Sequence, residues 1–159
     1  MKKLMILLVL LVLLVPTYGC KKRLTQYSNG TITLTLPEGF TEGHSDDYEY
    51  MLTSGDAIVL CSHADKKFLE NNGIEDITLD EFTAFFSSDK TLLLDRGFKN
   101  YNVFSYESEI NGLTSYNMIG VYQVEDGFWL VNFICDNTDV KKFEADFLDW
   151  AGMVTFRSH

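Results

Sequence analysis

The sequence predicts an α+β protein in which an antiparallel sheet of about six strands is covered by helices on both faces. The first supporting observation is that residues 101–135 contain two turn dipeptides, Asn111-Gly112 and Asp126-Gly127, between three long apolar strands. These dipeptides favour type I′ hairpins, because both central residues must adopt φ > 0 and these residue types tolerate it. We therefore expect an antiparallel three-stranded meander.

The second observation is that these strands are apolar on both faces. In the last strand, Trp129 and Phe133 point one way, whereas Leu130 and Ile134 point the other way, interrupted only by Asn132. In an antiparallel sheet with one solvent-exposed face, apolar and polar residues alternate along each strand. Because these strands do not alternate at their centres, each face of the sheet needs a covering layer.

The third observation is that two segments have helical signals. Thr78 and Glu81 have the spacing of a capping box, which predicts a helix start at this point. We expect the helix to continue its apolar stripe through Leu93 and to stop at Gly97. A second amphipathic helix is predicted after the meander. Its apolar residues at helical spacing are Val140, Phe143, Phe147, Ala151 and Val154, with Trp150 beside them.

The strands before the first helix are shorter. Residues 31–36 alternate strictly, which predicts a half-buried strand. Residues 48–52 and 57–62 are predicted to pair as a second hairpin. Residues 66–76 are polar, and we expect at most one helical turn there.

The N-terminus is predicted to be a targeting signal. Two lysines precede an unbroken apolar run of 12 residues, 4–15, whereas a membrane-spanning helix needs roughly 20. A charged start followed by a short apolar core is typical of a secretory signal peptide. The end of this segment resembles a bacterial lipoprotein signal, with Gly19 before Cys20, although Thr17 and Tyr18 depart from the usual residues.

This resemblance implies cleavage before Cys20 and its lipidation, palmitate being the expected acyl chain. The alternative is an ordinary secretion signal with a chance cysteine at its end. The expected organisation is a signal peptide over residues 1–19, a lipidated cysteine and short linker over 20–30, and one domain over 31–159. The mature chain would lie on the extracytoplasmic face of the cell membrane.

The charge of the mature chain restricts its partners. Without the signal peptide, 11 Lys+Arg stand against 23 Asp+Glu, a net charge of −12. Nucleic acid is excluded as an expected partner, because its phosphates would be repelled. The domain is also not expected to lie flat on anionic lipid, although Lys21, Lys22 and Arg23 follow the anchor directly and attract it locally.

Two small groups of residues are candidates for chemistry. Cys61 and Cys135 could form a disulfide in an extracytoplasmic protein; the alternative is two buried free thiols. His44, Asp46 and Asp47, with Glu49 nearby, are the candidate metal ligands. Their spacing matches no His-x-x-x-His or EF-hand pattern, which favours a solvated loop without metal.

The domain resembles the PsbP/Mog1/DcrB-like family over residues 30–157. The resemblance depends on Leu-Thr-Leu-Pro-Glu-Gly-Phe at 34–40, on the capped helix at 78–82, and on a closing helix ending in Thr-Phe-Arg at 155–157. It implies an antiparallel sheet with helices on both faces. Members of the family act mostly as binding or assembly factors, and they share no catalytic set that could be transferred to this chain.

These observations predict a membrane-anchored lipoprotein that acts as a non-catalytic binding or assembly module for an envelope protein or a small ligand, without a cofactor. The alternative is a metal-assisted hydrolase that uses His44 and nearby acids. His63, at a strand end, is expected to face water. Convergence of the two histidines with acids in an apolar-walled pocket would favour the enzyme.

Overall fold

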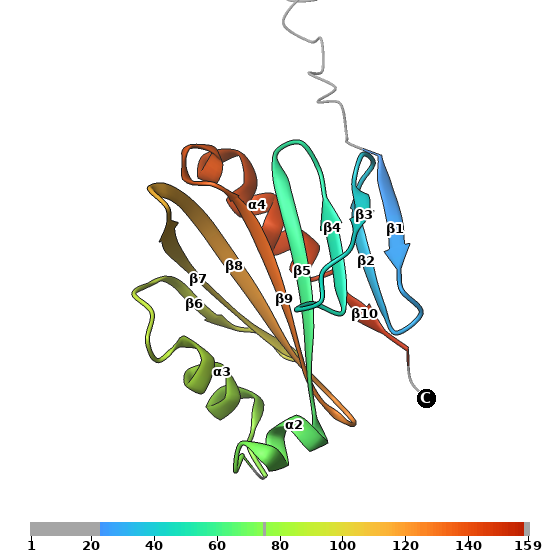
Figure 1. The fold of residues 1–159 in the computed structure, drawn as a ribbon, viewed down its shortest axis with the longest axis vertical. Coiled ribbons are helices and arrows are strands. Elements are labelled where there is room, and N and C mark those ends of the chain that lie inside the picture. The colour runs from blue at the N-terminus through green and yellow to red at the C-terminus, as the bar shows by residue number, and fades with distance from the viewer. Residues whose placement is uncertain (1–22, 75, 158–159) are drawn as a thin grey trace, which may run out of the picture.

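The computed structural model describes residues 23–74 and 76–157, and its strands form two antiparallel sheets (Figure 1). The strands are β1 (Leu24–Ser28), β2 (Ile32–Pro37), β3 (Thr41–Gly43), β4 (Tyr50–Thr53), β5 (Ala57–Asp65), β6 (Leu92–Gly97), β7 (Tyr101–Ile110), β8 (Leu113–Val124), β9 (Gly127–Asp136) and β10 (Thr155–Phe156). The helices are α2 (Lys66–Asn71), α3 (Leu79–Ser87), the 3-10 turn η1 (Asn137–Asp139) and α4 (Val140–Ala151).

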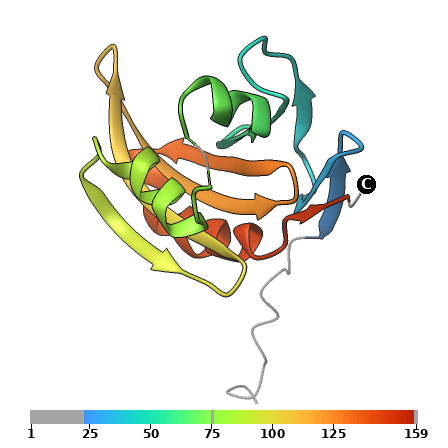
Figure 2. The same ribbon diagram turned by 90° about the horizontal axis from the view of Figure 1, so that it is seen from below.

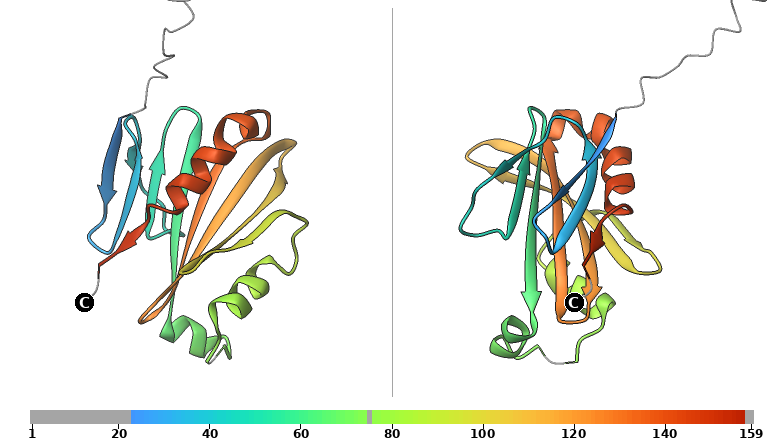
Figure 3. Two further views of the ribbon diagram at one scale, coloured as in Figure 1. Left: turned by 180° about the vertical axis from the view of Figure 1, so that it is seen from behind. Right: turned by 90° about the vertical axis from the view of Figure 1, so that its right-hand side faces the viewer.

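The larger sheet has seven strands in the order β3-β4-β5-β9-β8-β7-β6, and the smaller one has the order β1-β2-β10. Helices α2 and α3 lie on one face of the large sheet and α4 on the other (Figure 2). Seen from behind, α4 crosses the large sheet and leads into β10, an edge strand of the small sheet (Figure 3). The predicted α+β class, with an antiparallel sheet covered on both faces, is confirmed. The structure has more strands than the six expected.

Each face of the large sheet has its own core. On the α4 face, Phe147 and Trp150 pack on Phe133, and the small sheet contributes Ile32 and Leu34 to the same cluster. On the opposite face, the apolar side chains of α3 and of the sheet form a second cluster around Phe82, which is fully buried. The apolar residues found on both faces of the central strands are thus accounted for by two separate layers.

The two hairpin turns differ in type. Asn111 and Gly112 have φ of 54° and 78°, as the predicted type I′ turn requires. In the second hairpin Val124 pairs with Gly127, so Glu125 and Asp126 are the turn residues. Asp126 is not among the described residues with positive φ, and the type I′ prediction is wrong here. Gly127, at φ 144°, instead begins β9.

The first predicted helix begins where expected but ends early. Thr78 accepts from the backbone N–H of Glu81 at 3.3 Å, and Glu81 accepts from the backbone N–H of Thr78 at 2.9 Å, so the capping box is confirmed. The helix ends at Ser87, and Leu93 belongs to β6, which pairs with β7. A short apolar run such as residues 92–94 suits a strand as well as a helix, and pairing with β7 decides between them.

The ends of the domain also differ from the prediction. Residues 24–28, expected as part of a linker over 20–30, form β1 and pair with β2. The closing helix ends at Ala151, and Thr155 and Phe156 pair with β2 as β10. The small sheet therefore joins the two ends of the domain. Cys20 and the predicted signal peptide lie outside the described residues.

The disulfide alternative is wrong for this fold, because Cys61 and Cys135 are both free and buried. They lie on adjacent strands, but Cys61 is opposite Val131 and Cys135 is opposite Ala57. An offset of four residues corresponds to ~13 Å along the strands. A disulfide needs Cα atoms within ~7 Å.

We therefore predict that neither thiol reacts in the folded domain. Burial raises the pKa of the Cys61 thiol to about 12 and that of Cys135 to about 11, so both stay protonated at pH 9, where an exposed thiol is largely ionised. In a mature-length Cys20→Ala variant, a thiol-specific reagent should label neither cysteine until denaturant is added, and then both. Fast labelling of the native protein, or a mass increase on reduction, would contradict this arrangement.

The α2/α3 face is not covered along its whole length. Beyond α3, Ile58 is 37% exposed and a polar ladder crosses three strands. Asn132 donates to Asn117 (3.2 Å), Asn117 donates to Ser108 (2.9 Å), and the hydroxyls of Ser108 and Ser115 lie 3.0 Å apart. This ladder explains why Asn132 interrupts an otherwise apolar strand face.

Candidate functional site

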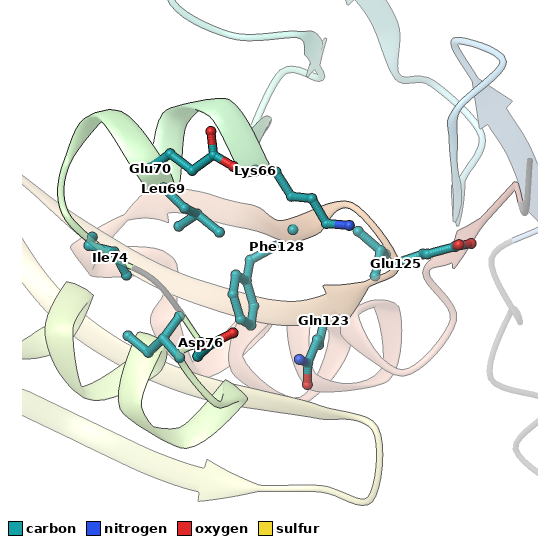
Figure 4. A pocket seen from close by; sticks show the side chains of 11 residues that line it. Lys66, Leu69, Glu70, Ile74, Asp76, Gln123, Glu125 and Phe128 are labelled. Atoms are coloured by element: carbon teal, nitrogen blue, oxygen red, sulfur yellow. The ribbon is translucent and has the colours of Figure 1, made fainter.

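The candidate site is a pocket between α2, the loop that follows it, and the β8–β9 hairpin (Figure 4). We call it the hairpin pocket; its volume is about 430 Å³. Pockets of roughly 300–1,000 Å³ are the usual size for small-molecule sites. Its lining residues are Lys66, Leu69, Glu70, Ile74, Asp76, Ile77, Gln123, Val124, Glu125, Gly127 and Phe128.

Helix α2 forms one wall and is held in place at its first residue. Asp65, the last residue of β5, caps the helix by accepting from the backbone N–H of Phe68 at 2.7 Å. The backbone N–H of Lys66 donates to the carbonyl oxygen of Asp126 in the hairpin turn at 2.9 Å. After the helix, the backbone N–H of Ile74 donates to the carbonyl oxygen of Leu69 at 2.9 Å, which turns the chain back over the pocket.

Gly127 permits the close packing of the hairpin against β5. A Cβ atom at this position would lie 2.1 Å from the carbonyl oxygen of Ala64 and 3.0 Å from the Cα of Asp65. Its φ of 144° is also a conformation that only glycine adopts readily. Glycine therefore lets the hairpin turn lie against the start of α2.

The floor of the pocket is apolar. Phe128 is 3% exposed and stacks on Phe82 of α3, with ring centroids 4.1 Å apart. Leu69 from α2 is also buried, and Ile74 and Ile77 pack against the same cluster. Figure 4 shows Phe128 between the helix wall and the loop that carries Asp76. The floor is thus part of the core of this face of the domain.

The rim of the pocket is charged. Lys66 and Glu70 come from α2, Asp76 from the loop and Glu125 from the hairpin turn, so three carboxylates stand beside one described cation. A second depression of about 610 Å³, lined by Leu79, Lys99 and Asn100, adjoins it and shares the hairpin wall of residues 123–125. An apolar floor with a predominantly acidic rim fits an occupant that combines an apolar group with hydrogen-bond donors or a positive charge.

None of the described residues that line the pocket is a serine, threonine, cysteine, histidine or tyrosine. The ionisable side chains of the lining are Lys66, Glu70, Asp76 and Glu125. They can pair with charged or hydrogen-bonding groups of an occupant.

The predicted metal candidates lie elsewhere, on the loop between β3 and β4. His44 Nε2 is 3.4 Å from Asp46 Oδ1, but the two side chains are 92% and 98% exposed. The backbone N–H of Asp47 donates to the Ser45 hydroxyl at 3.2 Å, which forms a local turn. Within residues 23–74 and 76–157, no group of three His, Cys, Asp or Glu side chains could hold a metal ion.

His63 does not face water as expected. Its side chain is 12% exposed and stacks on Trp129 with ring centroids 4.7 Å apart and planes inclined by 6°. Its Nε2 lies 3.4 Å from Asp126 Oδ1 without a hydrogen bond of good geometry. His63 and His44 line neither the hairpin pocket nor its adjoining depression, so the convergence that the hydrolase alternative requires does not occur there.

None of the residues that line the hairpin pocket is among the site residues predicted from the sequence. The sequence predicts Gly127 only as a turn residue, and residues 66–76 only as a polar segment. The polar segment is not close to residues 123–128 in sequence, and only the pairing of β5 with β9 brings them together.

Neither a protein-family model nor a curated protein matches this sequence. Among solved structures, the domain is similar to the cyanobacterial PsbP (CyanoP) of Synechocystis sp. PCC 6803, with 10% identity, a TM-score of 0.56, and coverage of 86% of this chain and 94% of that chain. At this identity the similarity shows a shared fold, so the predicted PsbP-like fold is confirmed.

Two further structures have TM-scores below 0.5 and support no argument. One is LpqN of Mycobacterium tuberculosis, described as involved in cell envelope biogenesis, with 9% identity, a TM-score of 0.48, and coverage of 86% of this chain and 91% of LpqN. The other is the Saccharomyces cerevisiae Ran-binding protein Mog1p, with 12% identity, a TM-score of 0.47, and coverage of 79% and 84%.

Proposed function

We propose that this protein is a lipid-anchored lipoprotein that works on the extracytoplasmic face of the membrane as a non-catalytic binding or assembly module. The observation that supports binding is the hairpin pocket, which joins an apolar floor to a charged rim. The anchoring part of the proposal depends on the N-terminal sequence, with Cys20 as the lipidated residue. The proposed partner is another envelope protein or a small ligand.

Among the described residues, no helix is long and apolar enough to cross a bilayer. The proposed attachment is through lipid on Cys20. A single acyl chain binds a membrane only reversibly, whereas two or more signals anchor a protein stably. A multiply acylated Cys20 followed by Lys21, Lys22 and Arg23 would combine hydrophobic insertion with electrostatic attraction to anionic headgroups.

Replacement of Cys20 with alanine tests the anchor. We expect the full-length protein to incorporate radiolabelled palmitate in cells and to sediment with membranes, and the Cys20→Ala variant to do neither. Cys135→Ala is the matched control, because it removes a buried cysteine and should leave both labelling and sedimentation unchanged. Palmitate that persists in the Cys20→Ala variant would contradict this part of the proposal.

The binding role is tested by crosslinking in intact cells, followed by purification of the tagged protein and identification of the molecules bound to it. We expect an envelope partner that is recovered with the anchored form and is reduced with Cys20→Ala, since the anchor places the domain beside its partner. Recovery of no specific partner from either form would contradict a role in protein assembly, and would leave a small ligand of the hairpin pocket to be sought by screening the soluble domain.

A further inference from the structure

The fold fixes the attachment point of the proposed anchor close to one end of the domain. Arg23 is already held, because its carbonyl oxygen accepts from the backbone N–H of Glu38 at 2.9 Å and its Nε lies 3.2 Å from the Glu38 carboxylate. Only Lys21 and Lys22 separate Arg23 from Cys20. The tether from Cys20 to Arg23 consists of three Cα–Cα steps and spans at most ~11 Å. The linker predicted over residues 20–30 would have spanned up to ~35 Å.

That attachment point and the hairpin pocket lie at opposite ends of the long axis. Figure 1 shows the start of β1 at the same end as the β4–β5 turn, the β7–β8 turn and the start of α4, whereas the β8–β9 hairpin and α2 are at the other end. The side view in Figure 3 agrees. Strand β8 runs between the two ends from Leu113 to Val124, which corresponds to ~37 Å at ~3.4 Å a residue.

We infer that the end formed by the start of β1 and the β7–β8 turn, here called the anchor end, faces the membrane, and that the hairpin pocket opens into the aqueous compartment. This inference rests on the proposed lipidation of Cys20. The tether over residues 20–23 spans at most ~11 Å, whereas the two ends of the domain lie ~37 Å apart along β8. The anchor end therefore stays within about 11 Å of the headgroups. An upright domain then holds the pocket beyond the reach of the bilayer.

One feature of the surface favours this orientation over a domain lying on its side. The anchor end exposes apolar side chains, with Leu113 at 74% and Leu24 at 48% exposed. Charge does not distinguish the two orientations, because Asp56, Asp136 and Asp139 lie beside Leu113 at the anchor end.

The orientation restricts what the pocket can bind. A site that faces away from the bilayer does not extract a lipid from the leaflet that holds its own anchor. Its occupant approaches through water, either as a solute or as a segment of another extracytoplasmic protein. The acidic rim of the pocket then meets its occupant away from the anionic surface.

The orientation is tested with one fluorescent label at each end of β8. Lipidation blocks the thiol of Cys20, and Cys61 and Cys135 are buried, so an introduced surface cysteine is the reactive one. Leu113→Cys and Glu125→Cys are each labelled with NBD in the lipidated protein and reconstituted into phosphatidylcholine–phosphatidylglycerol vesicles that contain a headgroup nitroxide. Leu24→Cys is a second label for the anchor end, and far-UV circular dichroism verifies that each variant is folded.

We expect NBD at positions 113 and 24 to lose most of its fluorescence to the nitroxide and NBD at position 125 to keep nearly all of it. Equal quenching at both ends would show a domain lying flat and would overturn the inference, as would quenching at 125 alone or at neither end. The intact mass of the same samples tests the proposed function separately. A mature protein without added lipid would overturn the anchor itself, whatever the labels show.

Discussion

Replacing Phe147 with alanine is expected to destabilise the domain by ~3–5 kcal/mol. Phe147 is fully buried on α4 and packs on Phe133 of β9 and Tyr116 of β8, with ring centroids 5.6 and 6.4 Å away. It also touches Phe143 and Trp150 on its own helix, both at 5.3 Å. Its removal loses this buried area and leaves a cavity that rigid neighbours cannot fill, so the loss is a large fraction of a typical stability of ~5–15 kcal/mol.

Phe85→Ala is the matched control, because it removes the same side chain from α3, where Phe85 is 57% exposed. We expect it to cost less than ~1 kcal/mol. The two variants are compared by urea unfolding, followed by far-UV circular dichroism. Tryptophan fluorescence is not used, because Trp150 lies beside Phe147 and its signal would change with the substitution. Equal small losses for both variants would show that α4 does not pack on the sheet as described.

The second large effect is expected for Gly127→Ala, because the new Cβ would lie 2.1 Å from a backbone carbonyl oxygen of β5. Backbone atoms cannot move aside as a flexible side chain can, so the hairpin must separate from Ala64. The φ of 144° adds strain of its own. We expect a loss of at least ~2–4 kcal/mol, together with displacement of α2 from the hairpin turn.

Gly112→Ala separates the two causes of this loss. Gly112 also has positive φ, at 78°, but a Cβ there meets nothing within 4 Å. We expect a cost of only ~1–2 kcal/mol, from the left-handed conformation alone. Hydrogen exchange gives a local readout: the amide of Lys66, which donates to Asp126, should exchange faster in Gly127→Ala and unchanged in Gly112→Ala. Equal effects of both variants on stability and exchange would contradict the close approach.

The elements that were correctly predicted are those with a local chemical signal. Thr78 and Glu81 mark a helix start, since both hydrogen bonds of the capping box join residues three apart. Asn111 and Gly112 mark a turn, because asparagine and glycine tolerate the positive φ values that it needs. Signals of this kind depend on neighbouring residues alone, so a single sequence is enough to show them.

The elements that were missed are stabilised by distant partners. Strand β10 consists of Thr155 and Phe156, and two residues have no recognisable period; they become a strand because they pair with Thr33 and Ile32. Strand β6 begins with an apolar run that suits two structures, and pairing with β7 decides between them. In both cases the deciding contact lies far along the chain.

The hairpin pocket could not be predicted for the same reason. The sequence predicts Phe128 only as an apolar residue of a strand and Lys66 only as a charged residue of a polar segment. Each becomes part of a site only because β5 pairs with β9 over nine residue pairs, from Ala57–Cys135 to Asp65–Gly127, and thereby places the start of α2 against the hairpin turn. Candidates chosen for chemical type, such as His44 and Asp46, instead lie on an exposed loop.

The most direct test of the binding role is site-specific photocrosslinking from the hairpin pocket in living cells. A photoreactive phenylalanine analogue replaces Gln123, an exposed residue shared by the pocket and the adjoining depression, and in a control it replaces Lys141, an exposed residue of α4 outside both. If the hairpin pocket binds a protein, position 123 captures an extracytoplasmic protein that position 141 does not. Capture of nothing at position 123, or of the same proteins from both positions, would contradict a protein-binding role of the pocket.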